Sequence, residues 1–155
     1  MTPAVVTLCA VAALVAALLG TARRTLVAVT VHGASMYPAL APGDRILVLR
    51  RGPSARRPRG GRVVVLRADR IPGAGPGGLL VKRVAARPGE PVPPGTGTGV
   101  VPAGHLVVLG DNPAVSTDSR VWGAVPSGSV AGVMVARIGR TGPPRPAAGR
   151  APRGA

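Results

Sequence analysis

Two residue types in this sequence could cooperate in nucleophilic chemistry, a serine and a lysine. Ser35 follows Gly33 and Ala34, small residues that let a substrate backbone approach closely. A serine hydroxyl attacks a carbonyl group only when a neighbouring group accepts its proton. Lys82 follows the aliphatic residues 79–81, and dehydration by such neighbours favours the neutral amine, which is a competent general base. The sequence therefore predicts a nucleophile at Ser35 and its base at Lys82.

Lys82 is also the only lysine among the 20 basic residues of the chain. With 23 Gly and 18 Pro beside the arginines, the composition is typical of a GC-rich genome, so a lysine kept against this bias indicates a need for an amine. Arginine could not act as the base, because its pKa exceeds about 12. Bringing a lysine pKa from about 10.4 to near 7 takes roughly 4 to 5 kcal/mol, which full burial can supply.

A third segment, residues 110–123 (Gly-Asp-Asn-Pro-Ala-Val-Ser-Thr-Asp-Ser-Arg-Val-Trp-Gly), carries side chains that could organise this pair. Ser116 could orient the lysine amine through a hydrogen bond, and Asp118 with Arg120 could form a charge-assisted pair that fixes the loop. Taken singly, a turn serine and a strand-end lysine on the surface are the ordinary interpretation. The joint occurrence of the three segments favours a site.

The two histidines offer a different arrangement, because His32 or His105 with Ser35 and an aspartate would form a conventional triad. Residues 33–37 lack the closing glycine of a nucleophile elbow, and His32 would alternate away from Ser35 in a strand. Exposed histidines at strand ends are therefore the favoured interpretation.

Composition limits the remaining possibilities for a chain of 155 residues, which has room for one domain. The net charge of +15 attracts phosphate or an anionic membrane surface, which leaves a basic nucleic-acid or membrane-surface binding module with inactive serine segments as an alternative. One Trp, one Tyr and no Phe argue against stacking on bases, so no nucleic-acid partner is expected. The single cysteine, Cys9, excludes an intramolecular disulfide and a multi-cysteine metal site.

The elements that must position these residues are short aliphatic runs separated by Gly and Pro. They predict a mainly β, antiparallel domain over residues 23–140, and residues 141–155, rich in Pro and Arg, predict a disordered tail. The expected strands cover residues 25–31, 45–50, 62–67, 79–85, 105–109 and 130–138.

Residues 1–22 carry no charged side chain and predict an N-terminal transmembrane helix. A cleaved secretory signal peptide with Gly20-Thr21-Ala22 as its cleavage site is the alternative. Arg23 and Arg24 conflict with an extracytoplasmic domain under the positive-inside rule, so the topology stays open. The arginines of residues 50–70 could rest on anionic lipid headgroups or form a solvated loop.

The three segments together resemble the conserved boxes of bacterial type I signal peptidases, the membrane-anchored serine proteases that use a Ser/Lys dyad. The patterns G-x-S-M-x-P-x-L-x-x-G-D, K-R-V-x-x-x-P-G and G-D-N-x-x-x-S-x-D-S-R-x-x-G are met by residues 33–44, 82–89 and 110–123. The resemblance implies a partly open antiparallel barrel preceded by one transmembrane helix, on the extracytoplasmic side of the cytoplasmic membrane. It also implies cleavage of exported preproteins after Ala-x-Ala, without a metal or cofactor.

Carried over to this sequence, the resemblance implies Ser35 as nucleophile, Lys82 as general base and Ser116 as the hydroxyl that orients the amine. It implies structural support from Asp118 and Arg120, and an oxyanion hole that includes the Ser35 N–H. Some relatives have a serine where this chain has Gly33, so a second donor here would be backbone or water. The residues expected to contact substrate are Met36, Pro38, Leu80 and Val81.

Two points qualify the resemblance. Arg62 stands where the family usually has the aspartate of Arg-Gly-Asp, a position that we interpret as scaffold. Related Ser/Lys hydrolases are alternatives: self-cleaving repressors would need a DNA-binding domain that this sequence lacks, whereas a maturation protease dedicated to one precursor stays open.

Overall fold

The computed structural model describes residues 3–50 and 57–141 of the chain, and within them the fold is mainly β. The predicted tail beyond residue 141 and the middle of the arginine-rich segment, residues 51–56, lie outside the described residues. The predicted strands are present with small shifts at their ends. The elements in chain order are α1 (Pro3–Thr25), β1 (Leu26–Thr30), β2 (Asp44–Leu49), β3 (Val63–Arg67), η1 (Ala68–Arg70), β4 (Leu79–Ala86), β5 (His105–Leu109), η2 (Pro113–Val115), α3 (Ser119–Trp122), β6 (Val125–Pro126), η3 (Ser127–Ser129) and β7 (Val130–Arg140).

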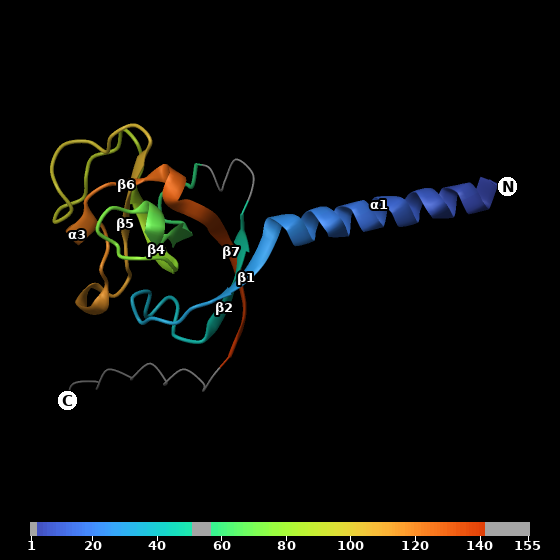
Figure 1. Ribbon diagram of the computed structural model, residues 1–155, viewed down its shortest axis with the longest axis horizontal. Helices are drawn as coiled ribbons and strands as arrows, with labels where there is room; N and C mark the ends of the chain where they lie inside the picture. Colours follow the sequence, from blue (N-terminus) through green and yellow to red (C-terminus); the bar gives the residue numbers. More distant parts are fainter. Residues whose placement is uncertain (1–2, 51–56, 142–155) are drawn as a thin grey trace, which may run out of the picture.

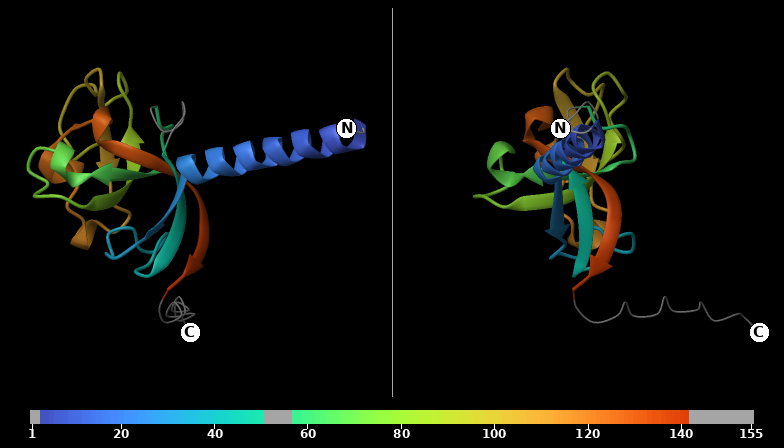
Figure 2. Two further views of the ribbon diagram at one scale, coloured as in Figure 1. Left: turned by 45° about the vertical axis from the view of Figure 1, so that its right-hand side comes forward. Right: turned by 90° about the vertical axis from the view of Figure 1, so that its right-hand side faces the viewer.

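The strands form one seven-stranded antiparallel sheet in the order β1-β2-β7-β3-β4-β5-β6. The sheet curves strongly, as the two views in Figure 2 show, so that it forms a half-barrel. Register shifts between β2 and β7 contribute to this curvature, because a bulge bends the strand that carries it. Gly132 on β7 allows the close approach of the two strands, since a Cβ there would lie 2.5 Å from the Val48 side chain.

Two apolar clusters pack on opposite faces of strand β3, because its successive side chains alternate between them. One contains Val64, Leu66, Val84 and Leu106, and the other contains residues of β2 and β3 together with Met36. The strand β3 is buried at four successive positions because it lies inside the sheet, which explains its continuous aliphatic sequence Val-Val-Val-Leu. Met36 is fully buried, and it therefore anchors the turn that carries Ser35 onto the core.

Helix α1 is followed directly by β1 at Leu26 and extends away from the sheet (Figure 1). Its Ala- and Leu-rich sequence favours helix, and its apolar side chains from Val5 to Leu18 are exposed. We expected a membrane-spanning helix over residues 1–22. This part of the prediction is corrected, because no helix in the described part of the chain has the length and apolar character that crossing a membrane requires.

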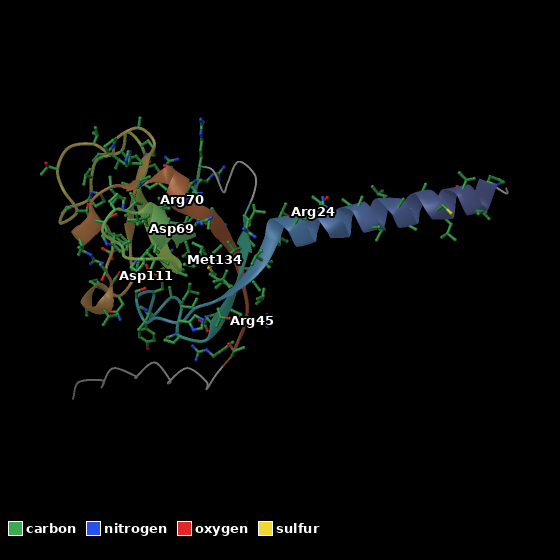
Figure 3. The ribbon with its side chains drawn as sticks, viewed as in Figure 1. Arg24, Arg45, Asp69, Arg70, Asp111 and Met134 are labelled. Carbon is green, nitrogen blue, oxygen red and sulfur yellow. The ribbon has the colours of Figure 1, made fainter. Side chains whose placement is uncertain are left out.

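All five acidic residues of the chain are paired with arginine. After Asp118, the most buried of these carboxylates is that of Asp44, which is 2% exposed. Its Oδ1 lies 2.9 Å from Arg140 Nε, and this ion pair holds the end of β7. The excess of positive charge is spread over the molecule: Arg24, Arg45 and Arg70 lie on three separate parts of the surface (Figure 3).

Candidate active site

A groove of about 580 Å³ runs between β1 and the first half of β4. One wall consists of residues 27–33 and Ser35, and the other consists of residues 79–82. The walls lie far apart in the sequence and are not neighbours in the sheet, so the curvature of the half-barrel brings them to face each other.

Both walls present backbone edges that can accept another strand. Strand β1 is the first strand of the sheet and pairs only with β2 among the described strands. In β4, residues 79–82 pair with β3, whereas pairing with β5 on the other edge begins at Arg83. An extended peptide in the groove would therefore find main-chain donors and acceptors on each side.

Ser35 lies on the turn that follows β1, and loop contacts fix its backbone. The Tyr37 amide donates to the Ala34 carbonyl at 3.1 Å. Asn112 then binds both peptide groups around the serine: its amide donates to the Ser35 carbonyl at 2.9 Å, and its side-chain Nδ2 donates to the Ala34 carbonyl at 3.3 Å. The direction of the Ser35 side chain is thus set jointly by its own turn and by the loop after β5.

Lys82 lies at the opposite wall and is only 4% exposed. Its Nζ donates a hydrogen bond to Ser116 Oγ at 3.0 Å. Burial lowers the pKa of the Lys82 amine, and the charge of Arg120 lowers it as well, whereas the charge of Asp118 opposes them. The net direction is toward the neutral amine that a general base requires.

Asp118 is fully buried beneath this lysine and collects hydrogen bonds from several donors. It accepts from Ser116 Oγ at 2.7 Å, from the Gly110 amide at 2.8 Å and from Arg120 at 2.5 and 2.9 Å. Burial alone would raise the pKa of Asp118, but the bonds from Arg120, Gly110 and Ser116 hold it well below its usual range. The carboxylate is therefore charged and paired, which fixes the loop and orients Ser116.

Gly110 allows these groups to meet, and its role was not predicted from the sequence. A Cβ at this position would overlap the Ser116 side chain and would lie 2.6 Å from the Ser35 carbonyl oxygen. Only glycine therefore fits between the nucleophile's turn and the hydroxyl that contacts the lysine.

An ion pair between Arg83 and Asp111 was also not predicted from the sequence. Arg83 follows Lys82 in β4, and Asp111 follows Gly110. Arg83 makes a bidentate pair with Asp111 at 2.8 and 2.6 Å and donates to the Gly61 carbonyl at 2.7 Å. Because successive strand residues point to opposite faces, Lys82 enters the groove while Arg83 fastens β4 to the loop from the other side. This alternation of side chains along β4 was the signal in the sequence that could have indicated a structural role for Arg83.

The structure brings some of the predicted site residues together and separates others. Ser35, Lys82, Gly33, Leu80 and Val81 line the groove, and Ser116, Asp118 and Arg120 lie beside Lys82. In the described part of the chain, Ser35 and Lys82 make no hydrogen bond with each other. Of the predicted substrate contacts, Met36 is buried in the core and the exposed Pro38 is not part of the groove wall.

The histidines occupy positions unlike those of a triad. His32 is exposed at the rim of the groove, and His105 on β5 has its Nδ1 3.0 Å from the Ala103 carbonyl oxygen. Neither has a hydrogen bond to Ser35 within the described residues. Those residues also contain no group of three His, Cys, Asp or Glu side chains that could hold a metal ion.

Comparison with known proteins identified a family model and solved structures that match this chain. The family model described as "Signal peptidase, peptidase S26" matches residues 3–98 and 91–138. The chain is similar to the crystal structure of a signal peptidase I from Enterococcus faecalis V583, with 22% identity and a TM-score of 0.39 over 51% of this chain and 97% of that one. No protein with curated annotation matched.

Proposed function

Because the chain belongs to the signal peptidase family, peptidase S26, we propose that it cleaves signal peptides from exported preproteins with Ser35 as nucleophile and Lys82 as general base. The family makes the protein a serine peptidase that acts on preproteins with signal peptides. The single observation that best supports the finer assignment is the buried Lys82 amine, which lines the same groove as Ser35 and has its pKa lowered.

In the proposed acylation step, Lys82 Nζ accepts the proton of Ser35 Oγ as the oxygen attacks the scissile carbonyl carbon. The Ser35 N–H donates to the oxyanion of the tetrahedral intermediate, and because Gly33 has no side chain, a second donor is a backbone group or water. Collapse of the intermediate breaks the C–N bond, and the Lys82 ammonium gives its proton to the leaving amine. The products of this step are an ester on Ser35 and the mature protein's free N-terminus.

Deacylation returns the enzyme to its starting state. Lys82 takes a proton from water, the hydroxide attacks the ester carbonyl, and Ser35 leaves with the proton that Lys82 gives back. Ser116 serves both steps as an acceptor for an amine N–H, so that the nitrogen lone pair is free to face Ser35. Asp118 and Arg120 act as positioning residues, since they hold Ser116 and not the substrate.

The substrate lies in the groove as an added strand between the Gly33 segment and residues 79–81. Main-chain hydrogen bonds to the two free edges supply binding that is independent of sequence, and alternate side chains face the groove wall. Leu80 and Val81 on this wall favour small side chains at the first and third positions before the scissile bond, consistent with Ala-x-Ala. Met36 supports this wall from the core, and Pro38 shapes the turn beyond the nucleophile.

We place the reaction at a membrane surface, on the extracytoplasmic side of the cytoplasmic membrane, where preproteins emerge. The family suggests this location, and the exposed apolar residues of α1 together with exposed arginines such as Arg24 and Arg59 suit contact with lipid and anionic headgroups. Residues 23–140 form the protease domain in this proposal. Flotation of the full chain with anionic or neutral vesicles measures the lipid contact, and equal absence from both floated fractions would contradict it.

The activity is tested with the full chain and a preprotein that carries Ala-x-Ala before its cleavage site. Mass spectrometry of the product should show one new N-terminus after the second alanine. Ser35→Ala and Lys82→Arg should each abolish cleavage, because the first removes the nucleophile and the second installs a permanently charged side chain. Ser127→Ala, a half-exposed serine outside the groove, is the matched control and should be unaffected.

The same assay distinguishes a general signal peptidase from a protease dedicated to one precursor. A peptide library with varied residues around Ala-x-Ala should be cleaved broadly by a general enzyme. Cleavage that survives Ser35→Ala or Lys82→Arg would exclude the Ser/Lys mechanism.

A further inference from the structure

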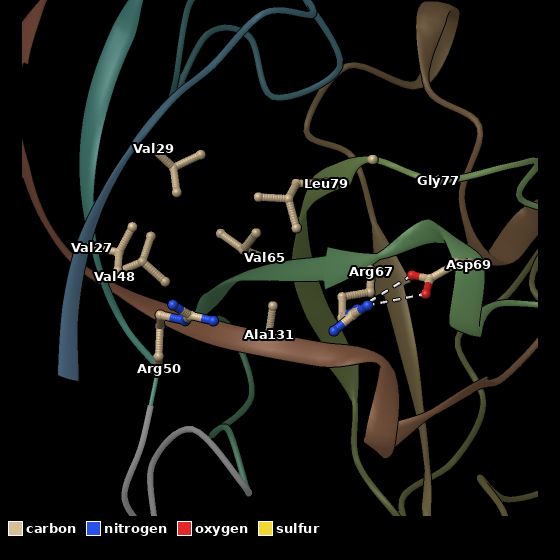
Figure 4. A pocket seen from close by; sticks show the side chains of 11 residues that line it. Val27, Val29, Val48, Arg50, Val65, Arg67, Asp69, Gly77, Leu79 and Ala131 are labelled. Carbon is tan, nitrogen blue, oxygen red and sulfur yellow. Dashed lines mark hydrogen bonds and ion pairs between the residues drawn. The ribbon is translucent and has the colours of Figure 1, made fainter. Parts of the chain in front are cut away.

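A second hollow of about 480 Å³ continues the groove at the end away from Ser35, beside the start of β1 (Figure 4). It shares Val27, Val29 and Leu79 with the groove, so one peptide strand can pass over both. Its volume lies in the range of about 300–1,000 Å³ that is usual for ligand pockets. The apolar side chains that line it are Val27, Val29, Val48, Val65, Leu79 and Ala131.

Strand geometry tells which substrate residue faces this hollow. Val31, Val29 and Val27 follow one another at every second position along β1, and Val81 and Leu79 do so on the face of β4 that they share with Val65. Because side chains alternate along a strand at about 3.3 Å per residue, the first and third substrate residues before the scissile bond face the groove beside Ser35. The next side chain on the same face is the fifth, and it reaches the hollow at Val27 and Leu79.

The charges at the rim of the hollow add a second constraint. Arg67 is paired with Asp69 at 3.2 Å, so its charge is compensated. Arg50 extends toward the hollow beside Val48 (Figure 4), and within the described residues its guanidinium has no hydrogen bond or ion pair. An uncompensated cation beside an apolar wall repels a second cation.

We propose that this hollow is a specificity site for the fifth residue before the scissile bond, which binds a bulky apolar side chain and rejects a basic one through Arg50. The proposal rests on the proposed function, since it takes the substrate to be a strand in the groove. It extends that function from the small residues beside the nucleophile to a larger residue farther upstream.

Peptides that keep Ala-x-Ala and vary only the fifth position, as Ala, Leu, Phe, Glu or Lys, test the proposal. We expect Leu and Phe to raise kcat/KM about tenfold over Ala, mainly through a lower KM, and Lys to fall below Ala. Anisotropy with labelled peptides and the Ser35→Ala variant should give the same order in Kd, which makes the test independent of turnover.

Two variants with matched controls show whether the hollow causes the preference. Ala131→Leu fills the hollow and should reduce the Leu-to-Ala ratio to near one while cleavage of the Ala peptide stays within about twofold. Ala136→Leu, exposed on the same strand β7, is its control. Arg50→Glu should reverse the discrimination against Lys, whereas Arg45→Glu on the same strand region, outside the hollow, should not. Thermal unfolding verifies that each variant folds.

The two levels of proposal fail differently. No preference at the fifth position, or a preference that Ala131→Leu leaves intact, would overturn the specificity site while cleavage at Ala-x-Ala continued. The proposed function would be overturned if the wild-type chain did not cleave, or if cleavage persisted without the Ser35 hydroxyl. In that case the order of Kd values among the labelled peptides would still decide whether the hollow binds the fifth residue.

Discussion

The Lys82 amine donates to Ser116 at 3.0 Å, and the Ser116 hydroxyl directs its own proton at Asp118, away from the amine. This direction matters because a neutral amine has only one lone pair. A hydroxyl that donated to the nitrogen would consume that lone pair, whereas Ser116 as acceptor orients the amine and leaves the lone pair available. Asp118 enforces the direction of the Ser116 hydroxyl by accepting its proton. Arg120 compensates the charge of Asp118, so that Asp118 favours the charged form of Lys82 less strongly.

The pH dependence of cleavage should follow the titration of Lys82. Its pKa is lowered by burial from the ordinary value of 10.5, and only the neutral form accepts the serine proton. We expect kcat/KM to rise with pH through the lowered pKa and to reach a plateau below pH 10.5. Initial rates from pH 5 to 10 measure this, and a rate that does not change over that range would exclude a titrating amine.

Replacement of Lys82 by methionine should separate function from stability. Between the lowered pKa of the folded chain and the ordinary pKa of the unfolded chain, the unfolded chain binds more protons, so the free energy of unfolding rises with pH. Lys82→Met removes this dependence and should be inactive but more stable than wild type at low pH, with the difference shrinking as pH rises. Thermal unfolding at several pH values measures it, and a difference that grew with pH would have the wrong sign.

Ser116→Ala should weaken the enzyme less than loss of Lys82. The amine loses its acceptor and its orientation, so we expect kcat to fall about tenfold to a hundredfold, below the range for loss of a general base. Because a hydrogen-bond acceptor stabilises the charged ammonium, its removal should also move the midpoint of the pH–rate profile to lower pH. Ser116→Thr, which keeps the hydroxyl, should recover most of the rate. An unchanged midpoint would argue that Ser116 does not contact the amine in the working enzyme.

Gly110→Ala should be more damaging than its size suggests. The added methyl group overlaps Ser116 and approaches the Ser35 carbonyl, so both walls of the site must shift. We expect a destabilisation of about 1–3 kcal/mol, typical of overpacking, together with a large loss of kcat. Gly128→Ala, where a Cβ meets no atom within 4 Å, is the matched control. Equal behaviour of the two variants in denaturant unfolding and in cleavage would contradict the role of Gly110.

The strands and the chemical groups were predictable from local sequence. Aliphatic runs between Gly and Pro predicted β1, β2, β3, β4, β5 and β7, because a strand's burial follows from its own side chains. The short β6 was missed, since two residues carry no periodicity. The transmembrane prediction over residues 1–22 was not sustained.

The arrangement of the site residues in space could not be predicted from local sequence patterns. Sequence by itself determined that a serine, a single lysine and a Ser-x-Asp-x-Arg segment were present, because these are properties of residue type and spacing. Only the tertiary structure decided that β1 faces β4 across a groove, that Met36 belongs to the core, that Gly110 must lack a side chain, and that a second hollow ends at Arg50. The reason is physical: such features depend on how far the sheet curves, and that curvature arises from the packing of strands distant in the chain.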